Sequence, residues 1–140
     1  MPSSVQRWKF DVQILKANIE HFYSMKYDLD ERLLDFLVGI IRITEALPNT
    51  RAGNHVAGQL LRSGTSPHPN HGEAQAAESG KDFIHKMSIC LKELRESLRW
   101  LRLIEKAKLV EDKSNLQLLL KESDELVRIF VASIKTAGGK

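Results

Sequence analysis

The chain has 140 residues, of which 42% are apolar and 28% charged, and its formal net charge is +3. This composition is typical of one soluble globular domain, and it excludes a disordered chain. Cys90 is the single cysteine, so an internal disulfide is excluded and a reducing, cytoplasmic setting is expected. No apolar run approaches the roughly 18 residues of a membrane span. The first residues include Arg7, Lys9, Asp11 and Lys16, a pattern unlike a secretory signal.

A single apolar stripe with helical spacing runs along residues 5–22. It consists of Val5, Trp8, Val12, Leu15, Ile19 and Phe22. Ser3 or Ser4 could cap this helix. Two interpretations stay open: residues 1–24 pack as an amphipathic helix on the main domain or on a neighbouring subunit, or they are an unstructured extension and Met25 is the natural start. We therefore divide the chain into an N-terminal extension, residues 1–24, and a main domain, residues 25–140.

The next segment, DLDERLLDFLVGIIRITEALP, predicts a helix that is apolar on two faces and must be buried on both. Asp28 and Asp30 are candidate N-caps, and Pro48 ends the helix. A shorter helix, RAGNHVAGQLLRSG, follows at residues 51–64, with Asn49 or Thr50 as its cap. Three small residues on it would let a neighbouring backbone approach closely, namely Gly53, Ala57 and Gly64.

Residues 65–73 read as a corner between two helices. Ser66 precedes Pro67, which disfavours the α conformation at Ser66, and Asn70 with Glu73 resembles a capping box. A fresh helix is then expected from about residue 71 to residue 108. Two series with a spacing of seven predict its core face. They are Ala77, Ile84, Leu91 and Leu98, and Gly80, Met87, Leu94 and Leu101.

The last helix is expected over about residues 112–134. Its first apolar face consists of Leu116, Leu119, Leu120, Val127, Phe130 and Ile134, and its second of Leu118, Leu126, Ile129 and Val131. The predicted fold is therefore all-α, an up-and-down antiparallel four-helix bundle with an extra N-terminal helix or extension. Because two helices carry more apolar surface than one stripe, we expect the chain to form a homo-oligomer.

Charge on the long helix gives the main functional hypothesis. Residues 81–108 hold eight Lys or Arg and four Asp or Glu, a net charge of +4. The basic residues form one stripe with Ser88 between them: Lys81, His85, Lys92, Arg95, Arg99, Arg102 and Lys106. Such a row could follow a phosphate backbone in RNA or DNA. The alternative is that acids of adjacent helices or subunits neutralise it. Trp100 could stack on a base, or it could be a partly buried interface residue.

The sequence gives little support for a catalytic or metal-binding site. His68, His71 and Glu73 could suggest a metal site, but the last two diverge on a helix because they lie two residues apart. Ser63, Thr65 and Ser66 lack the strand-to-helix turn of hydrolases. We expect no catalytic residue, metal or cofactor. Cys90 is expected to be a small buried apolar residue.

The stretch GQLLRSGTSPHPNHGEAQAAESGKDFIHKMSICLKELRESLRWLRLI resembles the four-helix bundle family also called the S23 or ribosomal-RNA intervening-sequence protein family. The resemblance runs from about Tyr27 to Thr136. It is carried by Leu61 to Ser66, Asn70, Glu73-Ala74, Ser79, Asp82-Phe83, Lys86, Leu91-Lys92-Glu93 and Trp100-Leu101. Arg62, Ser63, Gly64, Thr65, Asn70 and Glu73 are expected to form a structural corner.

The resemblance implies an up-and-down four-helix bundle, typically a ring-shaped homopentamer. Some members are encoded inside intervening sequences of large-subunit ribosomal RNA genes. Structurally similar relatives are accessory proteins of retroelement reverse transcriptases, which implies nucleic acid and a polymerase or another protein as possible partners.

Overall fold

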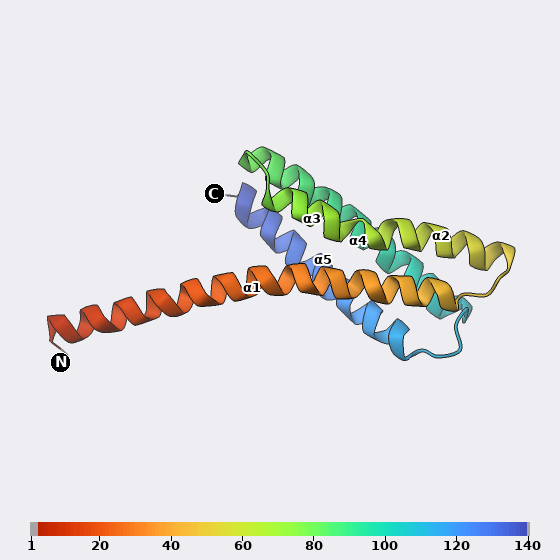
Figure 1. The fold of residues 1–140 in the computed structure, drawn as a ribbon, viewed down its shortest axis with the longest axis horizontal. Coiled ribbons are helices and arrows are strands. Elements are labelled where there is room, and N and C mark those ends of the chain that lie inside the picture. Colours follow the sequence, from red (N-terminus) through yellow and green to blue (C-terminus); the bar gives the residue numbers. More distant parts are fainter. Residues whose placement is uncertain (1–2, 140) are drawn as a thin grey trace. The chain divides into compact units, whose positions relative to one another are not determined.

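A computed structural model describes residues 3–139 of the chain, with side chains for 3–20 and 28–139. This part of the chain is helical and contains no strand. The elements are α1 (Ser4–Ala46), α2 (Arg51–Thr65), α3 (Pro67–Gln75), α4 (Gly80–Ala107) and α5 (Ser114–Gly138) (Figure 1). Internal contacts divide the chain into two units, residues 1–32 and 33–140, which are described separately.

The first unit consists of the N-terminal part of α1. Ser3 and Gln6 form a capping box, in which Gln6 N donates to Ser3 Oγ at 3.2 Å and Ser3 N donates to Gln6 Oε1 at 3.0 Å. Of the two interpretations, the structure agrees with a helix, and of the two candidate caps it has Ser3. The predicted new helix start at Asp28 or Asp30 is wrong, because both residues lie inside α1. No glycine or proline occurs between Ser3 and Gly39, so nothing in the sequence breaks the helix.

Two expectations about this unit fall on Phe22 and Met25, which lie outside the described side chains. Every described residue from 3 to 20 is exposed.

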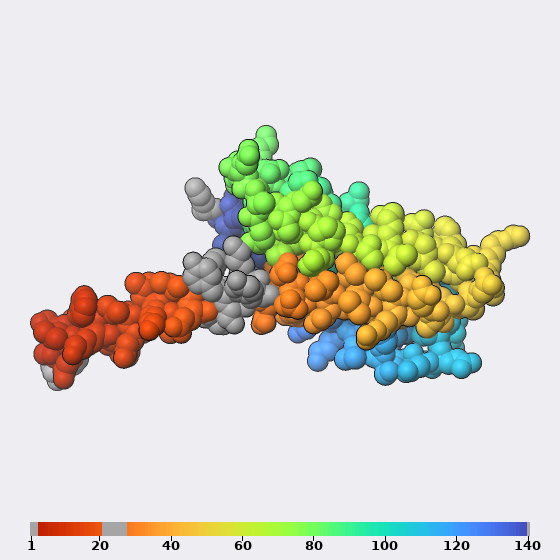
Figure 2. Space-filling view, in the orientation of Figure 1, coloured from red at the N-terminus to blue at the C-terminus, as the bar shows by residue number. Residues whose placement is uncertain are grey.

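The second unit is a bundle of four antiparallel rods, which confirms the predicted fold class. Residues 33–46 of α1 form the first rod, α2 and α3 together form the second, and α4 and α5 are the third and fourth (Figure 1). The chain reverses at residues 47–50, 76–79 and 108–113. In the space-filling view, atoms of residues 33–46 lie directly against those of α2 and α3 (Figure 2).

The predicted corner at residues 65–73 is not where the chain reverses. Only Ser66 separates α2 from α3, and Pro67 and Pro69 lie in the first turn of α3, where a missing backbone N–H costs nothing. The predicted cap at Asn70 is wrong, because its side-chain amide instead donates to Ser66 O at 3.0 Å and Ser66 Oγ at 2.9 Å. The reversal falls later, and Ser79 caps α4 by accepting from Asp82 N at 3.1 Å.

The core face of α4 also differs from the prediction. Its buried residues form a seam with alternating steps of three and four. This buried seam consists of Met87, Cys90, Leu94, Ser97, Leu101 and Ile104. Of the predicted series through Leu94, Met87, Leu94 and Leu101 are buried, as expected, but Gly80 is exposed. In the other predicted series, Ile84, Leu91 and Leu98 are only half-buried. Cys90 and Ser97 alternate with larger residues in the buried seam. Their small side chains allow the α2–α3 rod to approach α4 closely.

Helix ends in this unit follow the capping rules. Thr50 Oγ1 accepts from Gly53 N at 3.0 Å, which confirms one of the two predicted caps. Lys108 ends α4 in the left-handed conformation, with φ 55°, and Leu109 N then donates to Ile104 O at 3.1 Å. The fourth rod, α5, begins at Ser114 and extends to Gly138, past the predicted end.

Candidate nucleic-acid interface

Seven basic side chains follow one face of α4, and we call them the cationic stripe. The stripe consists of Lys81, His85, Lys92, Arg95, Arg99, Arg102 and Lys106, all of them exposed. From His85 to Arg102, each member lies two positions before a residue of the buried seam. Two positions correspond to about 200° around an α-helix. The stripe therefore faces away from the bundle core. It was predicted to flank the core seam, but the buried residues of α4 follow a different line from the one predicted, and the stripe lies opposite that line.

Two of the four acids on α4 are engaged by α2. Arg62 forms an ion pair with Glu93, with Nη1 and Oε2 3.1 Å apart, and its other terminal nitrogen pairs with Glu96. The Glu93 and Glu96 side chains are 13% and 31% exposed. These carboxylates are thus directed towards α2, where they share the single positive charge of Arg62. They do not reduce the charge of the cationic stripe through a direct contact.

The remaining acids of α4 lie near its ends. Glu105 accepts a hydrogen bond from Gln117 Nε2 of α5 at 2.7 Å. Asp82 lies in the first turn, where the helix dipole favours a negative charge. Among the described side chains, no Asp or Glu oxygen lies within 4.0 Å of a nitrogen of the cationic stripe. Within the described part of one chain, therefore, direct ion pairs do not neutralise the stripe.

The corner residues have a packing role that joins three rods. Ser63 is fully buried, and its Oγ lies 2.9 Å from Ser97 Oγ on α4. A Cβ on Gly64 would lie 2.7 Å from both Cγ atoms of Ile40 on α1, so the α1–α2 contact requires a residue without a side chain. Sequence reasoning predicted tight packing here but did not identify these partners.

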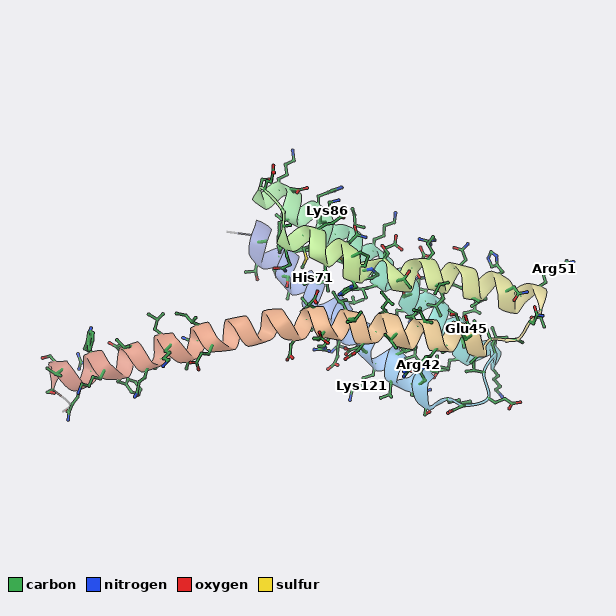
Figure 3. All side chains as sticks on the ribbon, in the orientation of Figure 1. Arg42, Glu45, Arg51, His71, Lys86 and Lys121 are labelled. Carbon is green, nitrogen blue, oxygen red and sulfur yellow. The ribbon has the colours of Figure 1, made fainter. Side chains whose placement is uncertain are left out.

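The other corner residues make local or surface contacts. Thr65 Oγ1 donates to the backbone carbonyl of Leu61, one turn earlier, at 2.6 Å. Glu73 of α3 pairs with Lys86 of α4, with Oε2 and Nζ 3.2 Å apart (Figure 3 labels Lys86). Together with Arg62, this pair connects the α2–α3 rod to α4. Such exposed pairs contribute little to stability, typically below about 1 kcal/mol.

Trp100 contacts its own chain. Its indole Nε1 donates to Glu96 Oε2 at 3.3 Å, and its ring meets the His55 ring edge-on with centroids 5.9 Å apart. The side chain is half-buried between α2 and α4. Its face is therefore partly occupied by contacts within the chain, and Trp100 is outside the cationic stripe.

His71 and Cys90 are core residues. The His71 ring packs edge-on against Phe130 of α5 with centroids 6.0 Å apart, and its Nε2 lies 3.0 Å from Gln75 Nε2. Cys90 is fully buried and its Sγ contacts Pro67 O at 3.5 Å. Burial raises the pKa of the Cys90 thiol to about 12. The expectation that Cys90 is a buried apolar residue is confirmed.

Within the described part of the chain, no group of three or more His, Cys, Asp or Glu side chains is arranged to hold a metal ion. The same residues include no helix long and apolar enough to span a bilayer.

A shallow recess of about 320 Å³ lies between the end of α1 and the start of α5. Its charged lining residues are Arg42 and Asp112. Hydrogen bonds from Ser114 N and Oγ hold the pKa of Asp112 below its usual range, so this carboxylate is ionised at neutral pH. An ionised carboxylate does not serve as a general acid there, and the lining includes no histidine or cysteine.

Residues 26–132 match the model of the 23S rRNA-intervening sequence protein family. The chain belongs to this family. It is also similar to a crystal structure from Bacteroides thetaiotaomicron, described as a protein of unknown function from the S23 ribosomal protein family. The two chains are 32% identical, with a TM-score of 0.70, and the match covers 76% of this chain and 98% of the other. No curated protein matches the chain.

Membership in the family confirms the resemblance identified from the corner and α4 residues. The S23 neighbour also supports the bundle fold, because it covers most of both chains at a high TM-score. Neither comparison assigns a reaction to this family, and the solved S23 protein carries a description of unknown function.

Proposed function

We propose that this S23-family protein is a non-catalytic, homo-oligomeric helical scaffold whose cationic stripe binds the phosphate backbone of structured RNA. The observation that carries this proposal is the exposure of all seven stripe residues, with no described carboxylate within ion-pair distance of them. The family's description as a 23S rRNA-intervening sequence protein is consistent with RNA as the nucleic acid.

The spacing of the stripe suits a backbone ligand. Steps of three and four residues along an α-helix advance by about 4.5–6 Å, so Lys81 and Lys106 lie about 37 Å apart along the axis. Charges on a rigid helix would contact phosphates and would read little sequence. We therefore expect affinity that depends strongly on salt and weakly on base sequence.

Exposed apolar residues support self-association of the bundle. Leu34, Val38 and Ile41 follow one face of α1 and are 37%, 37% and 41% exposed, and Leu118 on α5 is 68% exposed. An apolar row of this kind is a candidate protein interface. Light scattering of the full chain should give a mass that is a multiple of 15.9 kDa. A monomer at micromolar concentration would contradict the scaffold proposal, and five copies would agree with the ring expected from the family.

The binding proposal is tested by titrating the full chain into an RNA hairpin and a DNA duplex at about 50 and 200 mM salt. If four phosphates are neutralised, affinity should fall about a hundredfold between these conditions. The variant Arg95→Glu/Arg99→Glu/Arg102→Glu should bind weakly at both while keeping its helical circular dichroism, because these residues are exposed. Binding by this variant equal to wild type would refute the proposal and leave a protein-interaction module as the alternative function.

A further inference from the structure

The N-terminal part of α1 carries an apolar face that nothing in the described unit covers. Every described residue from 3 to 20 is exposed, and Val5, Trp8 and Leu15 are 61%, 66% and 60% exposed. An apolar row of this length on a water-exposed helix is unfavourable unless another surface buries it. The composition and register of the row indicate what that surface is.

The exposed row follows a heptad repeat. Counting Val5 as position a places Val5, Val12 and Ile19 at a, and Trp8 and Leu15 at d. By the same count along the sequence, the buried Leu33, Phe36, Ile40 and Ile43 also occupy positions a and d. Residues 5–19 therefore have the same register that is buried in the second unit. β-Branched residues at a combined with leucine at d favour a two-stranded parallel coiled coil, and here all three a positions are β-branched and Leu15 occupies one of the two d positions.

Charges beside the row favour the same arrangement. Asp11 occupies position g, and Lys9 and Lys16 occupy position e. In a parallel pair, position g of one helix faces position e of the next heptad on the other, so Asp11 faces Lys16 of the second copy, and the reverse pair also forms. In an antiparallel pair, e faces e, which brings lysines together. The charges therefore select a parallel orientation.

From these observations we infer that residues 4–20 of α1 pair with the same residues of a second copy of this chain as a parallel two-stranded coiled coil. The inference is independent of RNA binding and of the bundle faces. At about 1.5 Å per residue, the paired segment is about 25 Å long, short enough that dissociation is readily reversible. The row also includes Trp8, whose fluorescence reports its burial.

Disulfide trapping in the full chain tests the inference. In a parallel pair, the two copies of position 5 are neighbours, so Val5→Cys should form a disulfide-linked dimer under mild oxidation. Phe10→Cys, at the outer position f, is the matched control and should react about tenfold more slowly. Native Cys90 is fully buried and can remain in place. An antiparallel pair would instead place position d of one copy against position a of the other, and would link Trp8→Cys to Ile19→Cys when the two variants are mixed.

A second pair of variants tests whether trapping depends on the heptad row itself or on apolar residues anywhere on the helix. Adding Val12→Glu/Leu15→Glu to Val5→Cys places charges at a and d and should abolish trapping, whereas Phe10→Glu/Ile14→Glu, at f and c, should preserve it. Equal trapping at positions 5 and 10, preferential linkage of 8 to 19, or equal loss with both double variants would overturn the inference. So would a Trp8 fluorescence shift on anionic vesicles in a chain that shows no trapping, which would identify a membrane surface as the occupant.

Discussion

Ser63 on α2 and Ser97 on α4 are both fully buried, and their hydroxyl oxygens lie 2.9 Å apart. Each oxygen also lies near a backbone carbonyl of its own helix: Leu60 O at 3.4 Å from Ser63 Oγ, and Glu93 O at 2.9 Å from Ser97 Oγ. These small polar side chains let the two helices approach closely while satisfying their own hydrogen bonds. The contact joins the corner segment to the helix that carries the cationic stripe.

This pair predicts a measurable coupling. Ser63→Ala and Ser97→Ala should each destabilise the fold by about 1 kcal/mol, and the double variant by less than the sum, with a coupling of about 0.5–1.5 kcal/mol. Ser97→Leu should cost about 1–3 kcal/mol because it overfills the α2–α4 contact. Urea unfolding of the four alanine-cycle proteins checks the coupling. Full additivity would show that the hydroxyls do not interact.

Two glycines of α2 should respond in opposite directions to alanine. Gly64→Ala would place a Cβ 2.7 Å from Ile40 and should destabilise the fold by about 1–3 kcal/mol. Gly58 has no atom within 4 Å of the corresponding Cβ, so Gly58→Ala should stabilise it by about 0.5–1 kcal/mol through helix propensity. Thermal melts monitored by circular dichroism compare them. Equal shifts of the same sign would contradict the close α1–α2 contact.

Cys90 should be inert in the folded protein. Its thiol is fully buried and its pKa is raised from 9.0 to about 12, so the thiolate population at pH 8 is negligible. A colorimetric thiol reagent should label Cys90 only after denaturation. Since the thiol ionises more easily in the unfolded chain, its contribution to stability is complete below pH 9 and decreases as pH rises towards 12.

A cysteine-free variant provides the control for that pH dependence. Between pH 8 and pH 10, the free energy of unfolding should decrease less for Cys90→Ala than for the wild type. Each protein is compared with its own value at pH 8. Rapid labelling of the native wild type at pH 8 would contradict the buried position of the thiol.

Replacing Lys108 with glycine should stabilise the protein. It is the single described non-glycine residue with positive φ, at 55°, where a side chain is unfavourable. Lys108→Gly should therefore raise stability by about 0.5–1 kcal/mol. Lys106→Gly, inside the last turn of α4, is the matched control and should lower it by about 1 kcal/mol. A destabilising effect of Lys108→Gly would argue against a left-handed end to α4.

Hydrophobic periodicity predicted the helical bundle because each rod buries a face with a regular repeat. Local capping chemistry narrowed the cap of α2 to Asn49 or Thr50, and Thr50 is the residue that caps it. The same reasoning failed at Ser66. A proline after a helix can end it, but it can equally occupy the first turn of a following helix, and the local sequence is identical in both cases.

The place of Ser97 in the α4 seam and the partner of Glu93 and Glu96 could not be obtained from sequence alone. Ser97 is buried because the α2–α3 rod approaches closely, and small polar side chains give a weak signal in a search for large apolar residues. The pairing of Arg62 with Glu93 and Glu96 joins residues separated by 31 and 34 positions. Only the tertiary fold shows that these acids face α2.

The measurement that tests the central claim most directly is the salt dependence of RNA binding with two triple variants of equal charge change. Arg95→Gln/Arg99→Gln/Arg102→Gln removes part of the cationic stripe. Arg42→Gln/Arg51→Gln/Lys121→Gln removes exposed cations from α1, α2 and α5 (labelled in Figure 3). Both variants should remain folded by circular dichroism, since every substituted residue is exposed.

Each lost phosphate contact should reduce the slope of log affinity against log salt by about 0.9 for a duplex and about 0.7 for a single strand. For the stripe variant, the slope of log affinity against log salt should therefore become less steep by about 2–2.7 per protomer. The control variant should bind with the wild-type slope. An equal loss of slope in both variants, or an unchanged slope in the stripe variant, would contradict RNA binding through the cationic stripe of α4.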